Sequence, residues 1–151
     1  MVELTKLLMV ERSAILASAG AALGRAHLPH YDAEGAGDAD GRLASLFDLL
    51  VDAIARHDVT PMIEYSECVA EERYAAGYAL GEVQTAFNTL EEAAWRVVLN
   101  ELDPAKMAQA LGLIGTVLGA GKDALARRYV SLAADAHAGS LDLRALFTGA
   151  W

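Results

Sequence analysis

The sequence predicts an all-α fold, a single-domain bundle of about five helices. Apolar residues recur three and four positions apart along almost the whole chain, which is the spacing of helices that bury one face. Hydrophobic residues make up 54% of the 151 positions and prolines number only three, a composition that favours Ala/Leu-rich helices over β-branched strands. We expect the bundle to occupy residues 1–138 and an apolar C-terminal tail to occupy residues 139–151.

Two helices are predicted in the first part of the chain. The first runs from about Glu3 to His27 and ends before Pro29, which cannot continue a helix. The segment from Pro29 to Gly41 is small, acidic and glycine-rich and has no hydrophobic periodicity, so a surface loop is expected there. The second helix, from about Arg42 to His57, is clearly amphipathic.

The next two helices are separated by a glycine break. Thr60 is a natural N-cap for a helix from about Pro61 to Ala76, and Gly77 is expected to end it. The following helix, from about Leu80 to Glu101, has the most regular apolar repeat in the chain and therefore forms a packing surface.

A long fifth helix is predicted from Pro104, with Asp103 as its N-cap, to about Ala138. It contains the apolar run 111–121, which is too short for a membrane span and is interpreted as a buried segment. Gly112, Gly115 and Gly119 form one smooth strip on this helix. Close packing of a second helix is the favoured explanation of this strip, and a small-ligand cavity beside it is the alternative. Up-and-down and globin-like arrangements both fit the five helices.

Charge and cysteine content narrow the class of function. A formal net charge of −9 repels phosphate backbones, so nucleic acid is not an expected partner, and the short apolar run 111–121 gives no reason to expect a membrane partner. Cys68 is the single cysteine and cannot form an intramolecular disulfide. The first residues lack the basic segment and cleavage site of a signal peptide, so a cytoplasmic location is expected.

No residue pattern indicates catalysis, a metal or a cofactor. His27 and His30 flank a proline, which prevents regular helical ligand spacing. The row Glu64, Glu67 and Glu71 lacks the Glu-x-x-His motif of di-iron helical bundles, and a solvated acidic face explains it. The nearest sequence neighbours of Cys68 are glutamates, so this thiol is expected to be inert. We therefore expect a protein that is not an enzyme.

The segment around the glycine break carries a resemblance to a known family. Its residues are Glu72, Arg73, Gly77, Leu80, Glu82 and Val83, followed by Phe87, Leu90 and Trp95. Over about residues 45–135 the chain resembles the amino-terminal helical domain of RsbT co-antagonist (RsbRD-type) proteins and similar input domains of bacterial histidine kinases and transcription regulators. The resemblance implies a sensory or scaffolding module, related to haem-free globin-like domains, with no catalytic residues. It also implies dimerisation and an output partner, namely a STAS domain, a kinase or a transcription regulator, that is not part of these 151 residues.

Two hypotheses of function follow. The favoured one is a non-enzymatic bacterial signalling domain, of the kind found in stress-response input domains, that acts as a homodimer through protein–protein contacts. Its candidate interface residues are Phe87, Leu90, Ala94, Trp95, Leu143, Leu146, Phe147 and Trp151. The alternative is a sensor that holds a small ligand or haem beside the glycine strip, with His27, His30 or His57 near it. A weaker third option is an enzyme that works through the Glu64, Glu67 and Glu71 row.

Overall fold

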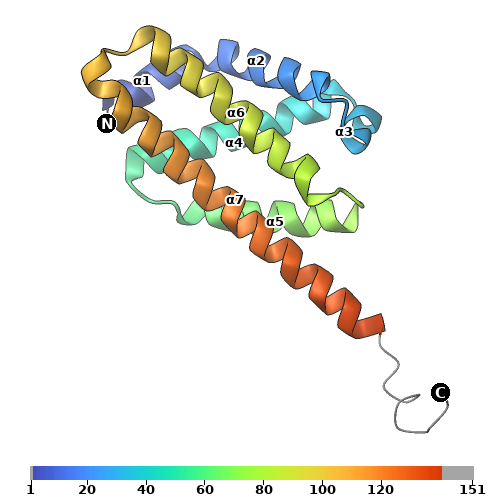
Figure 1. Ribbon diagram of the computed structural model, residues 1–151. Coiled ribbons are helices and arrows are strands. Elements are labelled where there is room, and N and C mark those ends of the chain that lie inside the picture. Colours follow the sequence, from blue (N-terminus) through green and yellow to red (C-terminus); the bar gives the residue numbers. More distant parts are fainter. Residues whose placement is uncertain (1, 141–151) are drawn as a thin grey trace, which may run out of the picture.

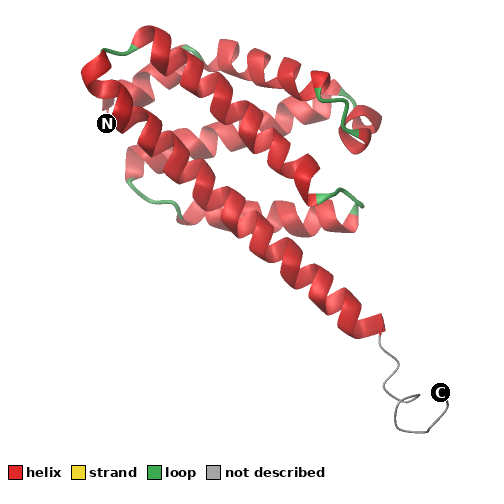
Figure 2. Cartoon of the chain, viewed as in Figure 1, coloured by secondary structure: helices red, strands yellow, loops and turns green. Residues whose placement is uncertain are grey.

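The computed structural model describes residues 2–140, and this part of the chain is helical with short connections and no strand (Figures 1 and 2). The predicted all-α class is confirmed for these residues, although seven helices replace the expected five or so. In chain order they are α1 (Val2–Val10), α2 (Arg12–Arg25), α3 (Pro29–Glu34), α4 (Ala36–Arg56), α5 (Thr60–Ala75), α6 (Leu80–Glu101) and α7 (Pro104–Ser140). The predicted tail residues Leu143, Leu146, Phe147 and Trp151 lie outside the described residues.

The first predicted helix is two helices. α1 and α2 meet at Glu11 with a bend of 67°, so the single helix expected from Glu3 to His27 is wrong in this respect. Both pieces bury the apolar residues that the spacing placed inward, because each piece keeps the helical period. The buried residues are Leu4, Leu8, Ile15, Ala19 and Leu23.

The segment from Pro29 to Gly41 is not a loop. Pro29 begins α3, as proline does readily at the first helical position, and Gly35 separates α3 from α4 with a positive φ of 97°. Tyr31 and Ala39 are buried in the core, and this burial holds both helical segments against the bundle. The sequence prediction missed these two anchors because they are too few to form a visible period.

Of the two sequence predictions about the ends of α5, the one for its first residues is wrong and the one for its last residues is confirmed. α5 begins at Thr60 with Val59 as its N-cap, so the predicted cap at Thr60 is wrong, and the Thr60 backbone N–H donates a hydrogen bond of 2.9 Å to the carboxylate of Asp58. This bond and a hydrogen bond from the Thr60 side chain lower the pKa of the Asp58 carboxyl group. At the other end Gly77 has a φ of 87°, and the Tyr78 N–H bonds the Arg73 carbonyl, which closes α5 as the glycine predicted.

The helices pack around one core. α7 packs most extensively along α5 and α6, while α2 packs on α6 and α4 (Figure 1). Several ion pairs join helices, among them Arg12 on α2 with Asp48 on α4 at 3.1 Å and Lys122 on α7 with Glu91 on α6 at 3.3 Å. The C-terminal end of α7 projects beyond the other helices (Figure 1).

Within residues 2–140, none of the helices taken singly combines the length and the hydropathy that crossing a membrane requires. α1 and α2 reach the required length and hydropathy only when taken together, across their bend.

Candidate functional site

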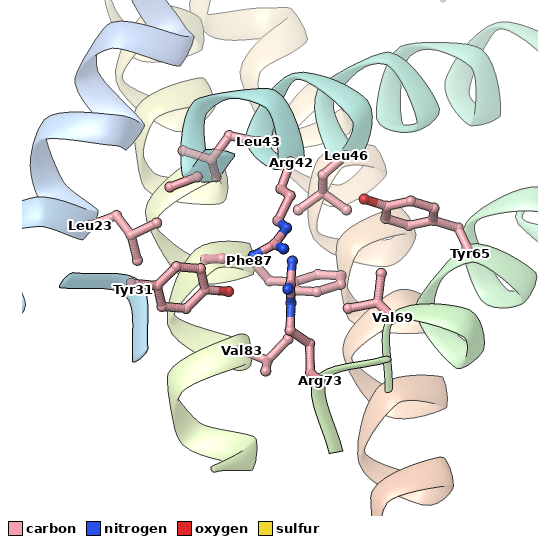
Figure 3. A pocket seen from close by; sticks show the side chains of 12 residues that line it. Leu23, Tyr31, Arg42, Leu43, Leu46, Tyr65, Val69, Arg73, Val83 and Phe87 are labelled. Carbon is pink, nitrogen blue, oxygen red and sulfur yellow. The ribbon is translucent and has the colours of Figure 1, made fainter. Parts of the chain in front are cut away.

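A small cavity lies where α2, α3, α4, α5 and α6 meet, and we call it the arginine pocket (Figure 3). Its volume is about 30 Å³. Apolar side chains form most of its wall, two tyrosines lie at its sides, and two guanidinium groups point into it from different helices (Figure 3). The lining residues are Leu23, Tyr31, Ala39, Arg42, Leu43, Leu46, Tyr65, Val69, Arg73, Val83, Ala86 and Phe87.

Arg73 is the most unusual residue of the pocket. Only 5% of its surface is exposed, and no described group accepts a hydrogen bond from its Nε–H. Its guanidinium carbon lies 4.9 Å from the centre of the Tyr78 ring, a cation–π contact that stabilises the charge only in part. A buried cation whose donor is unsatisfied is costly, so such a group in a cavity is a functional candidate.

The local sequence of α5 explains why Arg73 is buried. Met62, Ser66, Val69 and Ala70 are all buried and lie at helical spacing, and Arg73 continues the same face by one more turn. Arg42 reaches the cavity from the first half of α4, one position before the buried Leu43. Both arginines therefore enter from regular helices, which position their side chains more rigidly than loops would.

The tyrosines of the pocket supply neutral polar groups. Burial raises the pKa of Tyr65 above its ordinary value of 10.0, and the neutral phenol has an O–H that can donate a hydrogen bond. Tyr31 directs its hydroxyl toward the two arginines (Figure 3). The described residues that line the pocket include two arginines and no aspartate or glutamate, so the pocket is electropositive.

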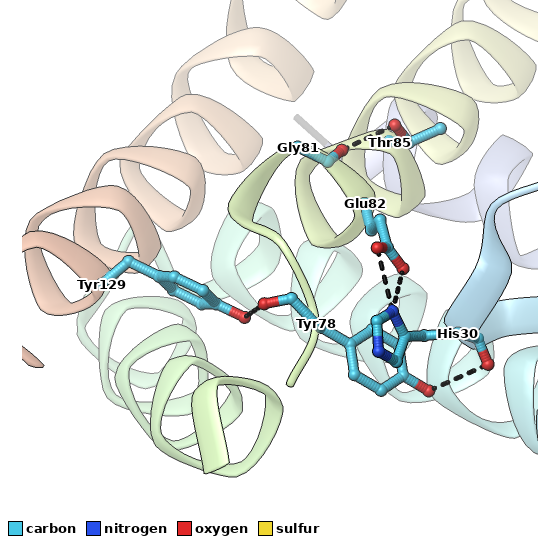
Figure 4. A network of polar contacts seen from close by, with 6 residues as sticks. All are labelled: His30, Tyr78, Gly81, Glu82, Thr85 and Tyr129. Carbon is cyan, nitrogen blue, oxygen red and sulfur yellow. Dashed lines mark hydrogen bonds and ion pairs between the residues drawn. The ribbon is translucent and has the colours of Figure 1, made fainter. Parts of the chain in front are cut away.

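A polar network centred on Tyr78 lies beside Arg73 of the pocket, and Figure 4 shows this network. His30 Nδ1 lies 2.9 Å from a carboxylate oxygen of Glu82 and its ring stacks on Tyr78 with centroids 4.7 Å apart. The hydroxyl of Tyr129, on α7, donates a 3.2 Å hydrogen bond to the Tyr78 backbone carbonyl (Figure 4). Because Arg73 lies over the same Tyr78 ring, this network connects the pocket to α7.

The network makes stability sensitive to alkaline pH. Burial raises the pKa of Tyr129 from its ordinary value of 10.0 to about 12, so the folded state holds the phenolic proton more tightly than the unfolded chain. The stability that this gives is complete below about pH 10 and is lost as pH rises toward about 12. We expect Tyr129→Phe to lose less stability than wild type between about pH 9 and 12 in urea unfolding. Parallel pH curves for the two proteins would contradict this assignment.

The predicted interface residues separate into two groups. Phe87, Leu90 and Ala94 are buried inside the bundle, with Leu90 0% exposed, so their place at a partner interface is wrong and they belong to the core. They pack there because the regular face of α6 covers α2 and α7. Trp95 differs, since 41% of its surface is exposed.

The glycine strip of α7 does not form the contacts expected of it. A Cβ at Gly112 or Gly119 would have no neighbour within 4 Å, and one at Gly115 would lie 3.6 Å from a carboxylate oxygen of Glu91. The prediction of close helix packing is therefore wrong at Gly112 and Gly119, and none of the three lines the arginine pocket. The close approach is at Gly121, where a Cβ would lie 2.9 Å from the Phe87 ring.

The other predicted candidates lie apart from the pocket. His27 is exposed and 3.9 Å from Asp32, and His57 ends α4 in the left-handed conformation with a φ of 55°. Cys68 is exposed, as are all three members of the Glu64, Glu67 and Glu71 row. Glu71 pairs with Arg128 of α7 at 3.1 Å. Within residues 2–140 no group of three or more histidine, cysteine or acidic side chains is arranged to hold a metal ion.

Sequence reasoning missed Arg42 and Arg73 as site residues. The signal for Arg73 is its place on the buried face of α5, since a charged residue at a core position of an amphipathic helix needs a partner. Comparison with known proteins gives no further assignment, because neither a family model nor a curated protein matches the chain.

Proposed function

We propose that this chain is a non-enzymatic signalling domain of the sensor type, whose input is a small ligand held in the arginine pocket. The observation that carries the proposal is the buried Arg73, which lines the cavity and whose Nε–H has no acceptor among the described residues. Ligand sites are concave, mostly apolar and contain a few converging polar groups, and the pocket has these properties. The resemblance to input domains of RsbT co-antagonist proteins agrees with such a role.

The position of the pocket suits a sensor. Five of the seven described helices contribute to its wall, so a bound ligand contacts elements that are far apart in the sequence. Arg73 contacts the ring of Tyr78, and the backbone carbonyl of Tyr78 accepts a hydrogen bond from Tyr129 on α7. A ligand that draws the guanidinium away from Tyr78 would change this link, and α7 would carry the change to an output partner such as a STAS domain, a kinase or a transcription regulator.

A retention experiment tests the proposed function. The purified protein is mixed with a bacterial small-molecule extract, separated by gel filtration, and its bound compounds are identified by mass spectrometry. Ala86→Val adds two methyl groups to the wall of a cavity of only about 30 Å³ and should abolish retention. Ala133→Val, which makes the same change at an exposed position of α7, should retain the compound as wild type does. Equal retention by all three proteins, or by none, would reject a ligand site in this pocket.

The pocket favours a small ligand over haem. A cavity of about 30 Å³ is far below the roughly 300–1,000 Å³ of pockets for drug-sized molecules, and a porphyrin is larger still. His30, the histidine nearest the pocket through Tyr78, already bonds Glu82.

Homodimerisation is a second candidate function, and it rests on α6. Trp95 and Leu99 lie one turn apart, with 41% and 52% of their surfaces exposed. Exposed large apolar side chains at helical spacing are typical of a partner contact. Sedimentation velocity at micromolar concentration should then show a species heavier than the 16.0 kDa chain, and Trp95→Ala should shift it toward monomer. A single 16.0 kDa species would reject the dimer.

A further inference from the structure

We infer that the ligand of the arginine pocket is a small monocarboxylate, whose carboxylate binds between Arg73 and Arg42. This inference rests on the proposed function, and it specifies the chemistry that the site recognises. It starts from Arg73, which lines the cavity, is only 5% exposed, and has an Nε–H without an acceptor among the described residues. An anion there would supply that acceptor and neutralise the buried charge.

The two arginines converge from different helices. Their guanidinium groups point toward one another across the cavity, from α4 and from α5 (Figure 3). An anion between the two guanidinium groups would attract both of them and offset their mutual repulsion. The surrounding low dielectric strengthens these attractions relative to water.

Size and shape favour a carboxylate over other anions. One water needs about 10–15 Å³ of cavity volume. The pocket, at about 30 Å³, therefore holds two or three atoms of that size, which matches the three heavy atoms of a carboxylate group. A tetrahedral phosphate is bulkier than a planar carboxylate group at the point where the two guanidinium groups converge, and at neutral pH it carries more charge to bury. Arginine also pairs its planar fork with the two oxygens of a carboxylate, and the Nε–H is one of the donors of that fork.

The walls select against bare inorganic ions. Leu43, Val69 and Phe87 present apolar surface that a short hydrocarbon chain would cover. A second cavity of about 160 Å³ shares Leu23, Tyr31 and Ala39 with the pocket and is also lined by Asp32 and Asp40, and we place the end of a short chain along the shared side chains. The net charge of −9 repels anions from the protein surface in general, so carboxylate binding would be specific to this site.

Thermal denaturation and calorimetry with a series of simple salts test this inference. Acetate, propionate and butyrate are compared with propionamide, phosphate and chloride at constant ionic strength. We expect the carboxylates alone to raise the melting temperature with saturation. Each added methylene should lower the dissociation constant about fourfold, which corresponds to about 0.8 kcal/mol of apolar burial. A response of equal size to chloride, phosphate and propionate would overturn the inference.

Two substitutions at one position and a matched control complete the test. Arg73→Met should fold, because an unbranched apolar side chain occupies the same space, and it should lose the propionate response. Arg73→Lys keeps the positive charge but lacks the planar guanidinium fork, and it should raise the dissociation constant of propionate at least tenfold. Arg12→Met removes an arginine that is exposed and paired with Asp48, and it should respond as wild type does. A propionate response that persists in Arg73→Met would overturn the inference.

The outcomes also separate this inference from the proposed function. If propionamide stabilises the protein as well as propionate, and Ala86→Val abolishes both effects, the pocket binds ligands but does not select carboxylates. If no compound of the series stabilises the protein and the extract leaves nothing bound, water is the partner of Arg73 and both proposals fail.

Discussion

Leu90→Ala is expected to lower the free energy of unfolding by about 2–5 kcal/mol, the usual cost of removing a fully buried leucine side chain. Leu90 is 0% exposed on the face of α6 that packs into the core. Truncation removes its apolar contacts and leaves a cavity that the neighbouring helices fill only in part. Urea unfolding of wild type and variant at equal concentration measures the difference.

Leu99→Ala is the matched control for this prediction. It makes the same chemical change nine residues further along α6, at a side chain that is 52% exposed. At a concentration where the chain is monomeric, its effect on the free energy of unfolding should stay within about 0.5 kcal/mol, as for most surface substitutions. If both variants lost the same free energy of unfolding, the Leu99 side chain would be buried against a partner as completely as Leu90 is buried in the core.

Gly121→Val should destabilise the protein by about 2–3 kcal/mol, because the site has no room for a side chain. A Cβ at Gly121 would lie 2.9 Å from the Phe87 ring, 2.9 Å from the Ser66 hydroxyl oxygen and 3.1 Å from Met62. These neighbours lie in the core between α5, α6 and α7, where a shift of one group displaces others. Thermal and urea denaturation of the variant measure the loss.

Gly112→Ala is the opposite case on the same helix. A Cβ at Gly112 meets no atom within 4 Å, so the better helix propensity of alanine should stabilise the protein by about 0.8–1.0 kcal/mol. If Gly121→Val were tolerated while Gly112→Ala was not, the face that α7 presents to α5 and α6 would be assigned wrongly.

The long elements were predictable because local chemistry alone defines them. α6 has the predicted bounds, Leu80–Glu101, since its apolar period is regular and Gly77 supplies the positive φ that ends α5 before it. α3 was not predictable in the same way, because its six residues depend on the burial of Tyr31 against other helices. The bend between α1 and α2 was not predictable, because the sequence around Glu11 contains no proline or glycine.

The site was less predictable than the fold. Periodicity places Phe87, Leu90 and Ala94 on one face of α6, but a face that packs in the core and a face that binds a partner have the same period. Spacing likewise does not tell which glycine of α7 another helix approaches, and the close one is Gly121. Arg73 was overlooked because charged residues are normally solvated, whereas this one continues the buried face of α5.

The most direct test of the arginine pocket is a ¹⁵N–¹H correlation spectrum of the arginine Nε–H groups during a propionate titration. The signal of Arg73, assigned by its loss in Arg73→Lys, reports on the donor that lacks an acceptor among the described residues. The Nε–H of Arg12 already donates to Asp48 at 3.1 Å and serves as the internal control. We predict a saturable downfield shift of the Arg73 proton while the Arg12 proton stays in place. An Arg73 signal that does not move, or that moves only in proportion to Arg12, would contradict a ligand site at this arginine.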